Sequence, residues 1–158
     1  MTCEGNRASA VGEDVIDEIG RASLLMRTRL ISRVITGIHD EEFRPFGIGS
    51  PQFVLLVVIF TIEPATRADI ARYHHQDRST LTRNLQVMLL QGWIEELQDE
   101  AGRRGRPVVL TTAGKDLLRN AKPAWQVAQA QAEALLGKDG MIAVMDIASR
   151  IMNDPPKA

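Results

Sequence analysis

The stretch that decides the fold runs from Asp77 to Gly114 and reads DRSTLTRNLQVMLLQGWIEELQDEAGRRGRPVVLTTAG. Its first part predicts a helix, because apolar residues return at intervals of three or four positions. They are Leu81, Leu85, Met88 and Leu89. Asp77 suits the N-cap, where a carboxylate accepts from the unpaired amides of the first turn, and Gly92 suits a left-handed C-terminal cap. The polar residues then fall largely on the other faces, where they are able to donate to base edges or phosphates.

A basic hairpin is predicted directly after this helix. Residues 93–97 read as one strand and residues 107–111 as its return. The tip between them carries two glycines and three arginines: Gly102, Arg103, Arg104, Gly105 and Arg106. Arginines on a narrow projection suit the negative potential of a DNA minor groove, although a solvated turn of basic composition gives the same pattern. The return strand leads straight into a predicted helix start at Thr111–Thr112. Helix, hairpin and helix therefore follow in the order of a winged helix-turn-helix.

The stretch resembles the MarR (multiple antibiotic resistance regulator) family of transcription factors. The resemblance rests on short runs that keep the family's order and spacing over roughly the whole chain. They are residues 46–48 (FGI), 51–53 (PQF), 77–83 (DRSTLTR), 92–95 (GWIE), 103–105 (RRG) and 110–114 (LTTAG). The resemblance implies a mainly α fold: a winged helix-turn-helix with long N- and C-terminal helices that form a dimerisation region.

The wing departs from the family's pattern at one point. Family members often carry Asp-x-Arg-x-x-Arg there. Asp99 and Arg104 fit the first and last positions, but Ala101 replaces the middle arginine, and Gly102 stands where an acidic residue is common. We therefore expect the wing to lack the family's usual salt-bridge scaffold and its tip to be more mobile.

The net charge gives no general attraction to nucleic acid. The 158 residues carry a formal charge of −1, with a sequence pI of about 6.3. Any DNA binding must therefore come from local placement of arginines. Four acidic residues lie in the predicted hairpin and oppose it: Glu95, Glu96, Asp99 and Glu100. We expect modest non-specific affinity and a site in which geometry counts for more than bulk charge.

The compartment is expected to be the cytoplasm. The single cysteine, Cys3, allows no intrachain disulfide and fits a reducing environment. The N-terminus lacks the apolar segment of a signal peptide, and the strongest apolar run, residues 53–60, is too short to cross a bilayer. Some MarR-like proteins sense hydroperoxides through an N-terminal cysteine held by hydrogen-bonding partners. Cys3 has no such partner in its polar tail, so the inert interpretation is favoured.

Three regions are predicted along the chain. Residues 1–12 form a flexible tail, residues 13–47 and 113–158 the helical dimerisation region, and residues 48–112 the winged DNA-binding lobe. At one end of the dimerisation region, a wide apolar stripe predicts a single helix over residues 11–38 that buries its face against more than its own chain. At the other end, we expect Pro123 to kink or break a helix over residues 113–136, and Gly137 to precede a last helix over residues 139–152.

The lobe between them reads as three helices before the hairpin. Residues 39–46 are expected to form a turn, after which Ser50 caps a second helix with Pro51 at its first position. Thr66 is expected to cap a third helix over residues 67–73, and residues 74–76 to form the turn of the helix-turn-helix.

The resemblance implies a sequence-specific regulator that binds double-stranded DNA. Two copies joined through their end helices would present two recognition helices about one DNA turn (~34 Å) apart, which calls for a pseudo-palindromic operator, where we expect repression. Residues expected to face the major groove are Ser79, Thr80, Thr82 and Arg83, with Arg78 and Gln86 at its edges. The wing would contribute Arg103, Arg104 and Arg106.

The family also implies a small ligand that changes the spacing of the two recognition helices. Such ligands are aromatic or phenolic acids or acyl-CoA thioesters, bound between the dimerisation helices and the DNA-binding lobe. The apolar and aromatic residues that could line the cavity are Met26, Leu30, His39, Phe43, Phe46 and Trp125. Arg27 or Arg44 would pair an anion. Taken singly, each aromatic fits an ordinary core position better.

Other classes of function fit the sequence less well. His74 and His75 are adjacent, so their side chains diverge, and no further residue has ligand spacing; we expect no metal site and no cofactor. No nucleophile or acid–base pair has a spacing that fits an enzyme. A winged-helix protein–protein interaction module without DNA binding stays open as the alternative, since the altered wing and the acidic hairpin favour it.

Overall fold

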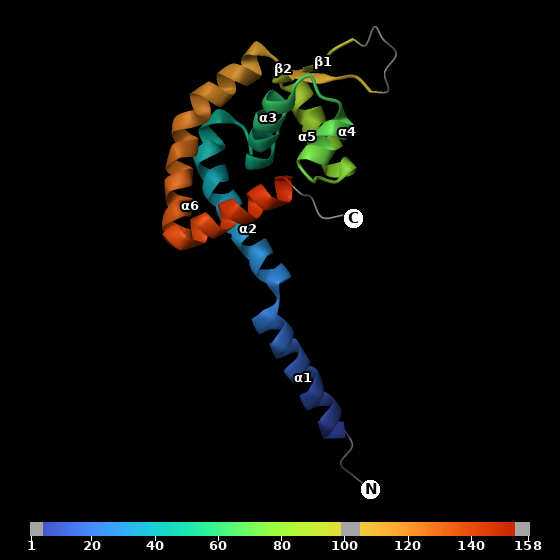
Figure 1. Cartoon of the computed structure of the whole chain (residues 1–158), viewed down its shortest axis with the longest axis vertical. Coiled ribbons are helices and arrows are strands. Elements are labelled where there is room, and N and C mark those ends of the chain that lie inside the picture. The colour runs from blue at the N-terminus through green and yellow to red at the C-terminus, as the bar shows by residue number, and fades with distance from the viewer. Residues whose placement is uncertain (1–4, 99–104, 154–158) are drawn as a thin grey trace. The chain divides into compact units, whose positions relative to one another are not determined.

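The computed structural model describes the backbone of residues 5–98 and 105–153 and the side chains of residues 12–98 and 105–153. The chain divides into two compact units, residues 1–37 and 38–158. The elements, labelled in Figure 1, are α1 (Gly5–Ala22), α2 (Leu24–Phe43), a 3-10 helix (Arg44–Phe46), α3 (Ser50–Ile62), α4 (Arg67–Tyr73), α5 (Arg78–Leu90), β1 (Ile94–Glu96), β2 (Val108–Leu110) and α6 (Thr112–Asn153). The fold is mainly helical with one two-stranded sheet, as predicted.

The first unit holds two helices where a single one was predicted. The break lies at Ser23, whose hydroxyl oxygen accepts from the backbone N–H of Met26 at 3.3 Å. A serine that caps the first turn of a new helix in this way competes with the continuing helix. The apolar stripe of this unit is exposed: Ile16 is 71 % and Leu24 is 76 % accessible.

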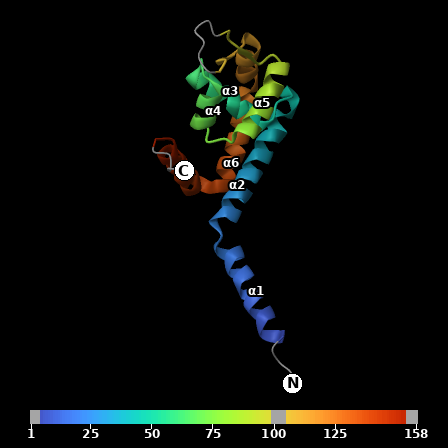
Figure 2. The ribbon, with the colours of Figure 1, turned by 90° about the vertical axis from the view of Figure 1, so that its right-hand side faces the viewer.

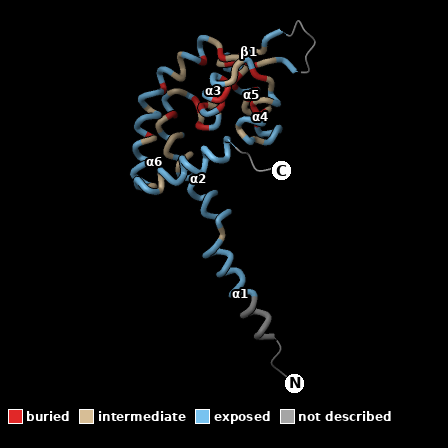
Figure 3. The backbone as a smooth tube through the Cα atoms, in the orientation of Figure 1, coloured by how far each residue is buried: buried red, intermediate tan, exposed pale blue. Residues whose placement is uncertain are grey.

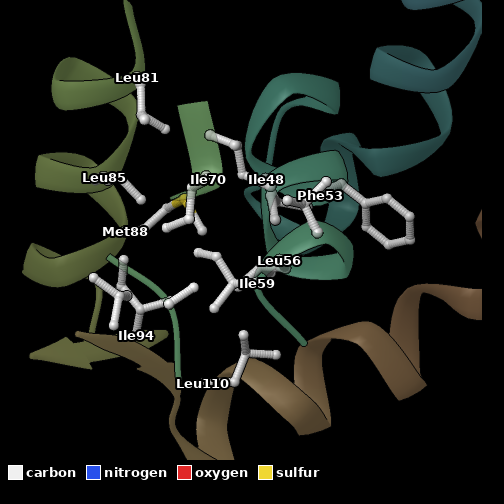
Figure 4. Close-up of a cluster of buried hydrophobic side chains, with 14 of the residues drawn as sticks. Ile48, Phe53, Leu56, Ile59, Ile70, Leu81, Leu85, Met88, Ile94 and Leu110 are labelled. Carbon is white, nitrogen blue, oxygen red and sulfur yellow. The ribbon is translucent and has the colours of Figure 1, made fainter. Parts of the chain in front are cut away.

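In the second unit, α3, α4 and α5 surround one hydrophobic core. Figure 4 shows that side chains from the three helices and both strands converge there, and Figure 3 shows buried positions in α3, α5 and the hairpin while most of α6 is exposed. Ile59, Ile70, Leu85 and Met88 are each fully buried. The period of three or four in α5 therefore predicted its inner face correctly.

The hairpin is fixed to the segment in front of α4. β1 and β2 pair antiparallel with Ile94 opposite Leu110. On its other side Val108 exchanges backbone hydrogen bonds with Ala65 at 2.8 and 3.3 Å, and the Leu110 N–H donates to Glu63 Oε2 at 2.7 Å. The base of the wing is thus held from both edges of β2.

The Leu-Thr-Thr-Ala-Gly run at residues 110–114, where α6 begins, has a steric explanation. A Cβ at Gly114 would lie 2.1 Å from the carbonyl oxygen of Trp93, so only glycine fits there. The Thr111 hydroxyl donates to the carbonyl of Gly92 at 2.6 Å and accepts from the Gly114 N–H at 3.1 Å. These contacts join the end of the wing to the end of α5.

Several predicted boundaries shift. α2 continues through Phe43 where a turn was expected. Gly49, not Ser50, is the N-cap of α3, because the Ser50 hydroxyl donates instead to Asp40 Oδ1 at 2.6 Å. Pro123 does not break α6, whose backbone leaves helical geometry at Gly137.

The path of α6 follows from that change. Figure 1 shows α6 turning sharply on the way to its C-terminal end, and the view in Figure 2, turned by a quarter, shows the C-terminal part passing below α4. A cavity of about 450 Å³ is lined by residues of α4 and by Met152 near the end of α6.

Within the described ranges, no single helix combines the length and apolar content needed to cross a membrane.

Replacing Leu85 by alanine should destabilise the fold by about 2–5 kcal/mol, because it leaves a cavity in the core beneath α5. The matched control is Leu90→Ala on the same helix, where the side chain is 87 % exposed and the loss should stay within about 0.5 kcal/mol. Urea unfolding followed by circular dichroism measures both. Equal losses at the two positions would contradict the assignment of the buried face.

Candidate nucleic-acid interface

α5, the predicted recognition helix, presents a polar face opposite its buried face. Leu81, Leu85 and Met88 point into the core. Ser79, Thr82, Arg83 and Gln86 follow one another at helical spacing on the far side. Ser79, Arg83 and Gln86 are exposed and Thr82 is half-buried, while Arg78 and Thr80 flank this face and are exposed. These side chains are accessible from one side of α5, and their roles in binding DNA stay predictions.

The start of α5 is organised by Asp77. Its Oδ1 accepts from the Thr80 N–H at 2.9 Å and from the Ser79 hydroxyl at 2.7 Å. The Ser79 hydrogen bond, followed by the bonds from Thr80, lowers the pKa of the Asp77 carboxyl well below its usual range. The carboxylate is therefore ionised at neutral pH, and it fixes the first turn of the helix.

Two of the predicted base-reading hydroxyls already make hydrogen bonds within the helix. Ser79 donates to Asp77, and Thr82 Oγ1 donates to the carbonyl oxygen of Arg78 at 2.7 Å. Each hydroxyl oxygen keeps acceptor capacity, so both side chains are set to accept from a base or a water rather than to donate. Arg83 and Gln86 supply donors on the same face.

An open groove lies between α4, α5 and the base of the wing. Its volume is about 820 Å³, and its lining includes three arginines, one glutamate and two threonines. They are Arg67, Arg78, Arg106, Glu96, Thr66 and Thr82. The groove therefore brings two predicted residues of the recognition helix next to the one predicted wing arginine that the structure describes. Arg103 and Arg104 lie outside the described residues, as do Asp99, Ala101 and Gly102 of the wing pattern.

Glu96 is the counter-charge of this groove. Its Oε1 accepts from Arg67 Nη2 at 2.5 Å, and its Oε2 lies 3.7 Å from Arg106 Nη1. The sequence presents Glu96 only as an acidic residue that opposes DNA binding. In the sequence, nothing marks Arg67 as a functional residue except that it follows Thr66, the N-cap of α4. Thr66 and Asp69 form a capping box there.

A second set of hydrogen bonds joins α2 to the recognition helix. Asp40 holds the first residue of α3, Gln52 Oε1 accepts from the Gly49 N–H at 2.9 Å, and Gln52 Nε2 donates to Asn84 Oδ1 at 3.3 Å. These polar contacts fix how α5 lies against α3. Long-range pairs of this kind leave no pattern in the sequence.

One histidine of the turn, His74, is shifted toward its neutral form. Burial, and then the charge of His75, lower the pKa of His74, which favours its neutral form. Among residues 5–98 and 105–153, no group of three His, Cys, Asp or Glu side chains is arranged to hold a metal ion.

The predicted ligand residues fall in both units. Met26, Arg27 and Leu30 belong to the first unit and are exposed. In the second unit Phe43 is 1 % exposed and stacks on Phe53 with ring centroids 4.3 Å apart, which is a core position.

The remaining predicted ligand residues lie nearer the surface of the second unit. The ring centroids of His39 and Phe43 are 5.9 Å apart, and Arg44 pairs with Glu41. Phe46 packs on the edge of the core, and Trp125 is 38 % exposed. Their joint role in binding a ligand stays a prediction.

The comparisons with known proteins agree with this geometry. The sequence profile of the MarR family matches residues 48–105, which run from the entry of α3 to the wing. The transcriptional regulator MosR of M. tuberculosis, in a structure complexed with DNA, is 31 % identical with a TM-score of 0.64 over 80 % of this chain and 97 % of that one. The chain belongs to the MarR family.

Two further relatives of this MarR-family chain differ in what they share with it. A mutant of E. coli MarR complexed with operator DNA shares the fold, with a TM-score of 0.74 at 20 % identity over 85 % of this chain and 97 % of that one. The uncharacterized HTH-type transcriptional regulator YwoH of Bacillus subtilis is 34 % identical over 80 residues, or 51 % of this chain. The chain spans 58 % and 62 % of the length of the two curated relatives that it matches.

The Asp77 cap predicts a pH dependence. Because the pKa of folded Asp77 lies below its unfolded value, the carboxylate stabilises the fold above about pH 4, and this contribution is lost as the pH falls further. Wild type should therefore be more stable than Asp77→Asn at pH 7, and the difference should shrink below pH 4. Urea midpoints from about pH 3 to 7 measure it.

Ser79→Ala serves as the control for that experiment. It removes the hydrogen bond that contributes most to the low pKa of Asp77, so it should reduce the pH dependence of the stability. A stability difference between wild type and Asp77→Asn that is the same at every pH would contradict this description of the cap.

Proposed function

We propose that this chain is a transcriptional regulator that binds double-stranded DNA in a sequence-specific manner. The observation that carries the proposal is the position of the arginine-lined groove beside the polar face of α5, on the side away from the core. Side chains that reach base edges and side chains that reach phosphates would then lie on one surface. The matched structures of E. coli MarR with operator DNA and of MosR with DNA support the same use of this fold.

The proposal includes a homodimer. In the first unit Ile16, Ile19 and Leu24 are 71 %, 56 % and 76 % exposed, and in the second unit Ile142 and Met145 of α6 are 52 % and 61 % exposed. Apolar faces of this extent are rarely left in water by a single chain. A second copy would bury the same faces on both partners, which gives a two-fold axis. Two recognition helices related by that axis call for a pseudo-palindromic operator.

Control by a small aromatic or carboxylate ligand is the finer part of the proposal. A ligand that binds one spacing of the two recognition helices better than the other would release the protein from its operator. Repression then follows if the operator overlaps a promoter.

The DNA-binding proposal is tested by selection from a library of random-sequence duplexes. Wild-type protein should enrich a pseudo-palindrome, and Arg83→Ala should weaken binding to that duplex by about 1–3 kcal/mol and relax preference at one position of each half-site. Arg119→Ala is the control, since this exposed arginine lies on α6 and pairs with Asp116. Gel shift across a salt series measures both. Failure of wild type to enrich any sequence would support the protein–protein interaction module instead.

The same duplex reports on the ligand. An aromatic carboxylate such as benzoate should lower the bound fraction of wild-type protein if release is part of the function. No change with any aromatic or aliphatic carboxylate would remove this part of the proposal.

The homodimer is tested with charges on the exposed face of α6. The double variant Ile142→Glu with Met145→Glu should turn a dimer into a monomer in sedimentation equilibrium at micromolar concentration, because it would bury two unpaired carboxylates at the interface. Leu90→Glu, at an 87 % exposed position on α5, should leave the dimer intact. A monomeric wild type would exclude the two-fold arrangement.

A further inference from the structure

Glu96 stands at the point where the wing meets α4. Along β1 the side chains alternate, so Glu95 is exposed while the Glu96 side chain is only 22 % exposed and turns into the groove. Its two carboxylate oxygens face two different arginines, Arg67 at 2.5 Å and Arg106 at 3.7 Å. Arg67 is the first residue of α4, and Arg106 lies just before the returning strand. One carboxylate therefore connects the outgoing strand of the wing, the segment before its return and the helix in front of the recognition helix.

We propose that Glu96 is a positioning residue for DNA binding. It holds the guanidiniums of Arg67 and Arg106, and with them the base of the wing, in the orientation that meets the phosphate backbone beside the recognition helix. The inference rests on the proposed DNA-binding function and adds to it a residue whose own charge is unfavourable for DNA.

The geometry leaves both arginines able to bind a phosphate while they are held. A guanidinium has five N–H donors, and Glu96 faces one terminal nitrogen of each arginine. The Arg67 and Arg106 side chains are 45 % and 75 % exposed. Both side chains are thus accessible enough for a phosphate to reach the donors that Glu96 does not engage.

The short sheet explains why such an anchor is needed. β1 and β2 share three residue pairs, and an isolated two-stranded hairpin of this length is marginally stable in water. Ala101 replaces the arginine of the usual wing pattern, so the sequence lacks one partner for a salt bridge within the wing. The pair of Glu96 with Arg67 joins the wing to α4, and its pair with Arg106 joins the two sides of the wing.

Stability alone does not account for this arrangement. Ion pairs between partly exposed side chains contribute little to folding. Their value in this chain lies in orientation, because guanidiniums that are already placed lose less freedom when they bind a phosphate.

The sign of the effect separates positioning from simple electrostatics. If Glu96 only repelled DNA, Glu96→Gln would remove a negative charge and strengthen binding to every duplex. If Glu96 positions the arginines, the same change should weaken binding in spite of the more favourable charge. Glu95→Gln makes an identical change in net charge at the neighbouring exposed position, and it is the matched control.

The experiment uses full-length protein and the duplex that wild type selects from the random library. The dissociation constant is measured from about 0.05 to 0.3 M salt for wild type, Glu96→Gln and Glu95→Gln. Glu96→Gln should bind about fivefold more weakly at 0.15 M salt, with a salt slope smaller by about 1, as expected when one phosphate contact is lost. Glu95→Gln should bind as tightly as wild type or more tightly.

A second variant keeps the positive charge at position 67 and removes the planar guanidinium. Arg67→Lys keeps one positive charge but cannot present the planar donors that reach Glu96 and a phosphate together, so it should also weaken binding and reduce the salt slope. Arg72→Lys, on the same helix and paired with Asp69, is its control and should bind like wild type. Thermal unfolding midpoints show whether each variant is folded at the temperature of the assay.

Two outcomes are kept apart by this design. If wild type selects a duplex and Glu96→Gln binds it as tightly as Glu95→Gln does, the positioning role is overturned while DNA binding stands. If wild type selects no duplex, the proposed function itself fails, and the inference fails with it.

Discussion

The burial of one face of α5 against α3 is the constraint on which the interface depends. Leu85 and Met88 are fully buried against Ile59 and its neighbours, so the helix has no rotational freedom about its axis. The outer face of the helix, and the Cα–Cβ bonds of the polar residues on it, therefore have a fixed direction. The hydrogen bond between Gln52 and Asn84 adds a polar contact to the same packing. Core packing, rather than any property of the polar residues, sets which face of this short amphipathic helix is presented to a partner.

The segment between α3 and α4 carries this rigidity to the wing. Glu63 accepts from the N–H of Leu110, Ala65 pairs with Val108, and Arg67 meets Glu96, so three residues at alternate positions each hold the hairpin. Lys115 Nζ, at the start of α6, lies 3.3 Å from Glu63 Oε1. This ion pair ties the chain that follows the wing to Glu63 as well. A hairpin with only three paired residues on each strand is thus supported along its whole base.

The sequence predicts what depends on neighbouring residues and misses what depends on distant ones. Helical spacing and an N-cap gave the limits and the buried face of α5, because both signals lie within the helix itself. The break at Ser23 was missed, since a serine fits both a helix interior and a new cap. Regular geometry in α6 ends at Gly137, because glycine adopts φ +69 without strain, and not at Pro123, which stands inside the helix. The partner of Glu96 lies 29 positions earlier, and nothing local marks it.

A chain with a net charge of −1 has to place its positive charge by structure rather than by composition. The hairpin appears acidic in sequence, yet in the fold one of its carboxylates faces the arginines of the groove. Arg67 and Arg106 are thereby partly compensated at short range, which limits their attraction to any polyanion at a distance, since screening reduces what remains beyond about 8 Å in physiological salt. In direct contact with DNA, the exposed N–H donors of the same arginines are still able to bind a phosphate. Under the proposed function, the acidic residues should therefore lower non-specific affinity for DNA more than specific affinity, because specific affinity depends on the orientation of the donors and non-specific affinity on net charge.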